Sequence, residues 1–158
     1  MLILPGTVLV FVPAGLLYAE HAWGSEPLAP SAQGEAMALS LLFFLAGLSL
    51  AITTVRLFVT VGQGTPAPWH PPKELVIRGP YRFVRNPMIT GVLLMLAGEA
   101  LFFSSALIFG WMAFFLVVNM IYLPLFEEKD LIKRFGAPYL EYKKNVPRWL
   151  PRLTPYTK

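Results

Sequence analysis

Four long apolar runs, separated by polar segments, dominate the chain. Asp, Glu, Lys, Arg and His are absent from residues 2–19, 36–55, 88–98 and 100–126, so that only Glu99 separates the last two runs. A bilayer core of about 30 Å requires roughly 20 apolar helical residues. The stretch 87–126 is long enough for two passes, with a turn at the polar pair Ser104-Ser105. We therefore predict four transmembrane helices, over residues 2–18, 36–61, 87–103 and 106–126.

The first of these helices has a competing interpretation. Pro5 and Pro13 interrupt its sequence, and each removes a helical hydrogen bond unless it lies in the first turn. A secretory signal peptide is the alternative, but no Lys or Arg precedes the apolar run, as such a peptide requires. We expect a retained helix.

Composition supports a membrane protein. Of the 158 residues, 56% are hydrophobic and only 14% are charged, whereas soluble domains carry about a quarter charged residues. A water-soluble globule is therefore disfavoured. The absence of cysteine excludes a disulfide-stapled module and a cysteine-ligated metal site. The length predicts a single domain over residues 1–158.

The cations predict the orientation in the membrane. No Lys or Arg precedes Arg56, whereas the 62–86 connection holds four and the segment after Phe126 holds eight. Positively charged loops stay in the cytoplasm, so we expect this connection, this segment and both termini on the cytoplasmic side. In a bacterium this would be the inner membrane. The net charge of +4 then reflects membrane topology and not binding to nucleic acid.

Two polar regions are expected on that side. The segment 62–72 carries four prolines, which exclude a helix and favour a stiff, extended loop. Residues 127–158 form a C-terminal cap, in which apolar residues at spacings of three or four over 131–142 predict an amphipathic helix, broken at Gly136 and Pro138. Trp149 and Leu150 lie between two arginines, a pattern that suits the lipid interface. The predicted fold class is an all-α integral membrane protein.

The start of the third helix is the first candidate site. In a purely structural interpretation, Asn86 suits an N-cap and Pro87 suits the first helical position. Arg82 and Arg85 are then ordinary membrane anchors. A helix N-terminus beside two arginines is, however, also an anion site. Both interpretations are compatible with the sequence.

Carboxylates provide further candidates. Glu127 and Glu128 directly follow an apolar run, where they either begin a solvated tail or bind a ribose hydroxyl or a cation at a dry boundary. Glu99 lies within a predicted helix near the outer surface, and a structural role, with the carboxyl either neutral or hydrogen-bonded, is favoured over function. Arg56 either anchors its helix in the interface or binds a substrate anion. His21 and His70 are expected on opposite sides of the membrane, so no metal site is predicted.

Residues 79–88, Gly91, a helical hairpin and the pattern Glu-Glu-x-x-Leu-x-x-x-Phe-Gly-x-x-Tyr-x-x-Tyr over 127–142 together resemble the isoprenylcysteine carboxyl methyltransferase family. That family is related to the phospholipid N-methyltransferases. The resemblance covers residues 62–151, including Val146-Pro147-Arg148. It implies an integral membrane enzyme that uses S-adenosylmethionine, bound in a cytoplasmic pocket, on a lipid-like or small hydrophobic acceptor that enters from the bilayer.

By position in the family motifs, the resemblance implies that the cofactor is bound by Tyr81, Arg85, Asn86, Pro87, Glu127 and Glu128. The family's usual His is Asn86 here, and its Tyr three positions later is Ile89. Asn-Pro-Met resembles the phospholipid methyltransferase variant of the motif, but it lacks a group that titrates near pH 7. The acceptor therefore stays open between an isoprenylcysteine-type carboxylate, an amine lipid headgroup and a thiol.

Physical chemistry adds one expectation to this resemblance. Tyr81, Tyr122, Tyr139 and Tyr142 have rings that can face a sulfonium through cation–π contact, although packing alone also explains aromatic residues at helical spacing. Two alternatives to the methyltransferase remain. One is a nicotinamide-dependent membrane reductase, and the other is a non-catalytic membrane scaffold of the same fold.

Overall fold

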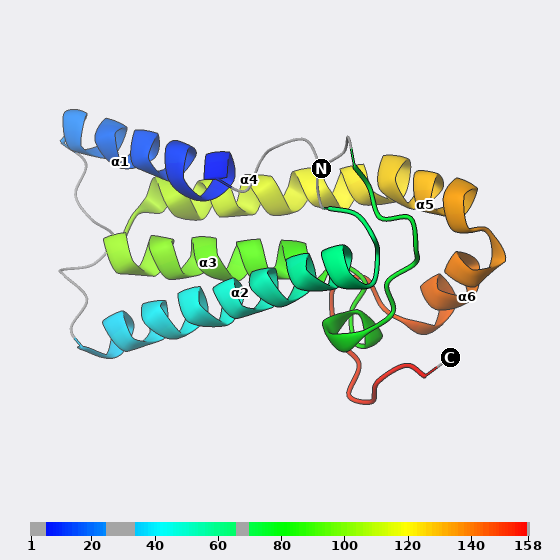
Figure 1. Ribbon diagram of the computed structural model, residues 1–158. Coiled ribbons are helices and arrows are strands. Elements are labelled where there is room, and N and C mark those ends of the chain that lie inside the picture. Colours follow the sequence, from blue (N-terminus) through cyan, green and yellow to red (C-terminus); the bar gives the residue numbers. More distant parts are fainter. Residues whose placement is uncertain (1–5, 25–33, 66–69, 158) are drawn as a thin grey trace. The chain divides into compact units, whose positions relative to one another are not determined.

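The computed structural model describes residues 6–24, 34–65 and 70–157, and over these residues its regular structure is entirely helical (Figure 1). The helices are η1 (Thr7–Phe11), α1 (Val12–Ala22), α2 (Gly34–Thr60), η2 (Gly79–Arg82), α3 (Pro87–Phe103), α4 (Ala106–Tyr122), η3 (Leu123–Glu127), α5 (Glu128–Phe135) and α6 (Ala137–Asn145). The chain divides into two compact units, of which one contains Leu50–Thr90 and Val118–Lys158, and the other Leu2–Ser49 and Gly91–Val117.

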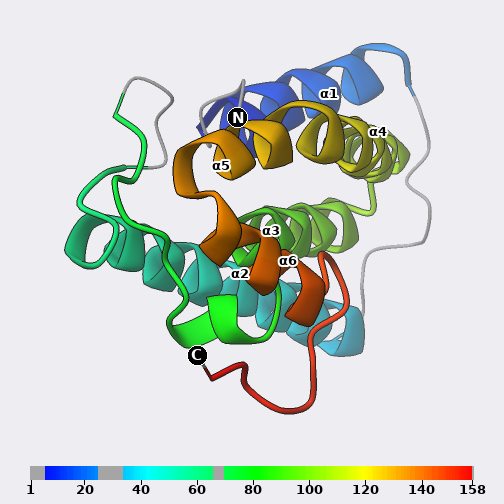
Figure 2. The same cartoon turned by 90° about the vertical axis from the view of Figure 1, so that its right-hand side faces the viewer.

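The unit containing 2–49 and 91–117 packs α1 along α4 (Figures 1 and 2). Val8, Val92 and Leu96 form its buried centre. The Trp111 indole Nε1 donates a hydrogen bond of 3.1 Å to the Val8 carbonyl. The predicted first helix is confirmed over its described residues, but it continues to Ala22 instead of ending at Tyr18, and Pro5 lies outside the described residues.

The same unit brings α2 and α3 close together at two glycines. A Cβ at Gly98 would lie 2.7 Å from the Ser40 carbonyl oxygen, and one at Gly47 would lie 2.9 Å from the Met95 amide nitrogen. Backbone atoms cannot move away as a flexible side chain can, so these positions require glycine. Close backbone approach through small residues is a common way for apolar helices to associate.

The predicted turn between the third and fourth helices is confirmed. Ser104 has a positive φ of 50°, and the Ser105 hydroxyl accepts a hydrogen bond of 3.1 Å from the Ile108 amide, capping α4. The α4 terminus is also capped from α1, because the Glu20 carboxylate accepts a bond of 3.0 Å from the Leu107 amide. Both caps satisfy amides that have no partner within the helix.

Glu99 lies on α3, and one of its carboxylate oxygens, Oε2, is buried without a hydrogen-bond partner among the described residues. Of the two states expected for Glu99, neutral or hydrogen-bonded, the hydrogen-bonded one is not found for this oxygen.

Two helical runs are long and apolar enough to cross a membrane, Gly34–Thr60 and Ala106–Phe135. The apolar helices Thr7–Ala22 and Pro87–Phe103 are shorter. The four predicted spans and their orientation stay predictions. In the run 106–135 the charged residues begin at Glu127, so 106–126 is its apolar part.

The fourth helix differs from expectation at its C-terminal end. Instead of ending at Phe126, the helix continues through the wide turn η3 into α5. Pro124 lies in the first turn of η3, where a π-type turn accommodates a residue that cannot donate a backbone hydrogen bond. Acidic residues in the first turn of α5 and basic residues in its last complement the helix dipole and favour this continuation.

The predicted break in the C-terminal cap is confirmed. Gly136, with φ of 59°, separates α5 from α6, and Pro138 lies in the first turn of α6 (Figure 2). Tyr139, Tyr142 and Val146 form a buried cluster to which Leu75 and Ile77 of the long connection add apolar contacts. The cap is therefore folded against the connection within the unit 50–90 and 118–158.

Substitution of Gly98 by Ala is expected to lower stability by about 1–3 kcal/mol, because the new methyl group overlaps the α2 backbone. Gly110→Ala on α4 is the matched control, since a Cβ at this position would have no other atom within 4 Å, and helix propensity there favours Ala by up to about 1 kcal/mol. Thermal unfolding of the purified protein, followed by circular dichroism, compares the two. Equal melting temperatures for the two variants would contradict the close approach.

Candidate functional site

A cavity of about 390 Å³ lies within the unit 50–90 and 118–158. Part of its apolar lining comes from the ends of the long helices, namely Phe58, Met88, Ile89 and Phe126, and the rest from the 62–86 connection and α5. Its polar lining comes from the 62–86 connection, α4, the end of η3, α5 and α6. This volume is within the range of roughly 300–1,000 Å³ found for small-molecule pockets. The cavity is thus a candidate ligand site with both apolar and polar walls.

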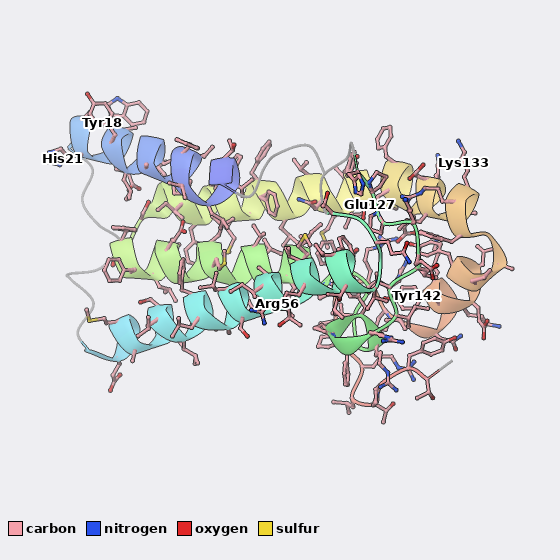
Figure 3. All side chains as sticks on the ribbon, viewed as in Figure 1. Tyr18, His21, Arg56, Glu127, Lys133 and Tyr142 are labelled. Carbon is pink, nitrogen blue, oxygen red and sulfur yellow. The ribbon has the colours of Figure 1, made fainter. Side chains whose placement is uncertain are left out.

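The cavity brings together four of the predicted cofactor residues, Tyr81, Arg85, Asn86 and Glu127. The other two, Pro87 and Glu128, are buried beside it and do not line it. Arg56 is exposed on α2 and is also not part of the lining (Figure 3). All six cofactor candidates therefore lie at or next to one cavity, whereas the predicted substrate contact of Arg56 gains no support.

Glu127 and Glu128 are adjacent in sequence but have different surroundings. Glu127 lines the cavity, and burial raises the pKa of its carboxyl. Glu128 is only 4% exposed and binds three cations from three parts of the chain. In the sequence pattern the two residues form one feature. In the structure, Glu127 lines the cavity and Glu128 is the centre of a group of buried ion pairs.

The ion pairs around Glu128 are short. Its Oε1 lies 2.7 Å from Arg85 Nη1 and 2.7 Å from Arg148 Nη2, and its Oε2 lies 2.8 Å from Lys143 Nζ. Arg148 Nε donates a further hydrogen bond of 2.9 Å to Oε1. Burial alone would raise the pKa of the Glu128 carboxyl, but the Lys143 hydrogen bond and the arginine charges outweigh it and lower the pKa. Glu128 thus remains an anion among three cations, and the cluster keeps an excess of positive charge.

Arg85 connects this cluster to the cavity. Its side chain is 10% exposed and lines the cavity, while one guanidinium nitrogen binds Glu128. Its Nε is buried and has no hydrogen-bond partner among the described residues. An unmade bond from a buried charged donor is costly. Arg85 therefore keeps a buried charged donor without a partner beside the cavity.

Tyrosines form much of the remaining wall. Tyr81, Tyr122, Tyr139 and Tyr142 all line the cavity, and Figure 3 shows Tyr142 and Glu127 in the unit that holds it. Tyr81 stacks on Phe58 with ring centroids 5.6 Å apart, and its carbonyl accepts a bond of 2.7 Å from the Tyr142 hydroxyl. Burial raises the pKa of Tyr81, Tyr139 and Tyr142, so these phenols are neutral.

The C-terminal segment holds the loop that carries Tyr81 and Arg85. The Arg85 amide donates to the Pro147 carbonyl (2.9 Å), the Arg152 amide to the Phe83 carbonyl (3.0 Å), and the Tyr156 amide to the Arg82 carbonyl (2.9 Å). We call residues 147–157 the strap. Because these bonds use only backbone groups, no sequence pattern indicated them.

The roles of Arg148 and Lys143 are not visible in the sequence, where both are cations of a basic tail. The nearest sequence signal is Val146-Pro147-Arg148, which the family resemblance includes without assigning a role. The pairing of Arg134 with Asp130 and with the Pro72 carbonyl on the cavity wall was also not predicted. Among the described residues, no group of three or more His, Cys, Asp or Glu side chains could hold a metal ion.

A sequence model of the phospholipid methyltransferase family matches residues 36–138 of this chain. The methanethiol S-methyltransferase 2 of Bradyrhizobium diazoefficiens is 40% identical over 76 residues, which are 46% of this chain and 27% of that relative. The chain thus matches about a quarter of the length of this curated relative. No solved structure matches the chain. The family match confirms the predicted relation to phospholipid methyltransferases.

Glu128→Gln is expected to destabilise the protein by about 3–5 kcal/mol at neutral pH, since it leaves three buried or half-buried cations without their common anion. Because the pKa of Glu128 is lowered in the folded state, its contribution is present above the carboxyl's ordinary pKa of about 4.3 and is lost as the pH falls through the lowered value. The free energies of unfolding of the unchanged protein and of Glu128→Gln, measured from neutral to acid pH, should thus converge.

Glu141→Gln is the control for this substitution. Glu141 is exposed and accepts one long hydrogen bond of 3.3 Å from the Tyr156 hydroxyl, so its loss should change stability by about 0.5 kcal/mol or less. Similar losses in both variants would mean that the ion pairs around Glu128 do not stabilise the fold.

Proposed function

Because this chain belongs to the phospholipid methyltransferase family, we propose that it is an S-adenosylmethionine-dependent methyltransferase of the membrane, with the cavity beside Arg85 and Glu127 as its active site. The observation that carries this proposal is the composition of the cavity wall. Polar groups suited to a water-soluble cofactor and apolar side chains from the ends of the long helices line the same space.

The residues of the cavity fit the cofactor. Its carboxylate suits the N-terminus of α3, where Asn86 and Arg85 line the cavity beside a cluster of excess positive charge. Its ribose hydroxyls are donors that suit the Glu127 carboxylate. Its sulfonium suits the neutral rings of the tyrosines on the wall. Pro87 would shape the start of α3, and Glu128 would act indirectly, by holding Arg85.

S-adenosylmethionine supplies an electrophilic methyl group that an in-line nucleophile accepts. Such a displacement needs little acid–base assistance when the nucleophile is a thiolate, a carboxylate or a neutral amine, so the protein contributes mainly proximity and orientation. Tyr81 is fixed by stacking on Phe58, and Arg85 by its ion pair with Glu128 and by the strap. These contacts keep the cavity wall in one arrangement before ligands bind.

The acceptor belongs to a lipid-like or small hydrophobic class. The apolar wall formed by Phe58, Met88, Ile89 and Phe126 supports such an acceptor arriving from the bilayer. A thiol, an amine lipid headgroup and an isoprenylcysteine-type carboxylate all belong to this class. The curated relative is named for methanethiol, and this name favours a thiol as the first acceptor to test. We place the active site and both termini on the cytoplasmic side, following the distribution of Lys and Arg.

The two alternatives have less support. A nicotinamide cofactor with a 2′-phosphate would meet the Glu127 carboxylate. Lys129 and Lys133 are exposed and do not line the cavity, and the two arginines that do line it are paired, Arg85 with Glu128 and Arg134 with Asp130. A scaffold without activity would have no need of a cavity that brings together four residues expected to bind a cofactor. The family match supports methyl transfer over both.

Calorimetric titration of the purified protein in nanodiscs tests the proposal. We expect saturable binding of S-adenosylmethionine and S-adenosylhomocysteine and none of NADPH. Binding of NADPH alone would favour the reductase. Failure to bind any of the three, in protein shown to be folded, would favour the scaffold.

Glu127→Gln is expected to weaken S-adenosylmethionine binding about tenfold, since hydrogen bonds to a charged group contribute about 1.5–3 kcal/mol. The fold should be unaffected, because the ion-pair centre is Glu128. Asp130→Asn is the matched control: Asp130 also lines the cavity, but it is exposed and paired with Arg134 at 3.5 Å, so binding should change less than twofold. Retained affinity in Glu127→Gln would remove this residue from the cofactor site.

A further inference from the structure

The exposed side of the strap combines apolar and cationic side chains. Leu150 is 81% exposed and Leu153 is fully exposed, although both are large aliphatic residues. From Lys143 to Lys158 the sequence has five cations and no Asp or Glu. Two of these cations, Lys143 and Arg148, bind Glu128. Leucines next to arginines, in a segment with no acidic residue of its own, are typical of segments that lie in the interface of an anionic bilayer.

The strap does not present these leucines as a loose tail. The backbone bonds of residues 147, 152 and 156 to the loop 82–85 fix it at three points. In addition, Arg82 Nε donates a bond of 2.7 Å to the Tyr156 carbonyl, and an Arg152 Nη1 donates 2.8 Å to the Asn145 carbonyl. Leu150 and Leu153 therefore project from a held backbone, where no described residue covers them.

An open groove of about 840 Å³ lies between the strap and the end of α2. It is lined by Val61, which follows α2 directly, by Arg78 and Arg82 of the connection, and by Tyr156 and Thr157 of the strap. Val55 and Val59, on the last turns of α2 before Val61, are exposed apolar residues. The charged residues of the lining are Glu74 and the two arginines, so that positive charge is in excess.

We propose that the strap and this groove form a binding surface for anionic phospholipid, with Leu150 and Leu153 inserted at the interface and Arg78 and Arg82 facing the lipid headgroups. The occupant is the bilayer that surrounds α2, because the groove begins where the apolar helix ends and its charge is complementary to an anionic headgroup. The surface is separate from the cofactor chemistry of the cavity, and the proposal does not depend on methyl transfer.

The chain contains no cysteine, so a single introduced cysteine can be labelled specifically. Leu153→Cys and Leu150→Cys, each carrying an environment-sensitive fluorophore, are placed in nanodiscs of phosphatidylcholine with or without phosphatidylglycerol. We expect the emission of the fluorophore to shift to shorter wavelength in the anionic discs, and lipids with a spin label near the headgroup to quench it. Salt should reduce the shift. Leu140→Cys on α6, half-exposed at 50%, is the matched control and should stay in a water-like environment.

Charge reversal separates lipid binding from simple burial of the label. Arg78→Glu should reduce the preference of the Leu153 label for anionic discs about fivefold or more, since each cation near an anionic surface contributes about 1 kcal/mol. Lys133→Glu, an exposed residue of α5 outside the groove, makes the same charge change and should have little effect.

A label that stays water-exposed in both discs overturns the proposal. So does an equal response in neutral and anionic discs, which would indicate apolar contact without headgroup recognition. A shift that depends on protein concentration and not on lipid would assign the surface to a second copy of the chain. None of these readouts requires the cofactor or an acceptor.

Discussion

The buried carboxylate of Glu128 is the interaction on which the candidate site depends. It draws together Arg85 from the loop before α3, Lys143 from α6 and Arg148 from the strap, with all three ion pairs at 2.7–2.8 Å. Removing one partner of a buried ion pair is strongly destabilising, because it leaves buried charge uncompensated. Here the cluster also holds the cavity wall, since the Arg85 side chain that binds Glu128 lines the cavity.

Much of the helical framework follows from the sequence. The third helix has its predicted bounds of 87–103, and the Ser104-Ser105 turn is where a polar pair interrupts forty largely apolar residues. These features are local: apolar runs, prolines and turn residues act through neighbouring backbone. The predicted end at Phe126 was wrong because charge marks where an apolar surface stops, which need not be where a helix stops, and the helix continues to Phe135 through the wide turn at Pro124.

The site was only partly predictable, for a related reason. Family motifs identified the stretches around Arg85 and Glu127, and the cavity unites them. They did not distinguish Glu127 from Glu128, because adjacent residues on one helix face different directions and only the packed structure shows which neighbour each one meets. Arg148 and Lys143 were hidden for the same reason, since a basic tail gives no sign of which cations bind an acid 15 or 20 residues earlier. Backbone bonds such as those of the strap carry no side-chain signature.

The strap also has a consequence for how the protein is made. Arg148 and the segment that follows it are synthesised after every group that they bind, namely the loop 82–85 and Glu128. Chains emerge from the ribosome at about 5–20 residues per second, and their early parts begin to fold first. The apolar helices can thus form while the loop bearing Arg85 still lacks the contacts that hold it. Completion of the pocket becomes a late event of biosynthesis, so a chain interrupted before Arg148 would have its long helices but an unfinished site.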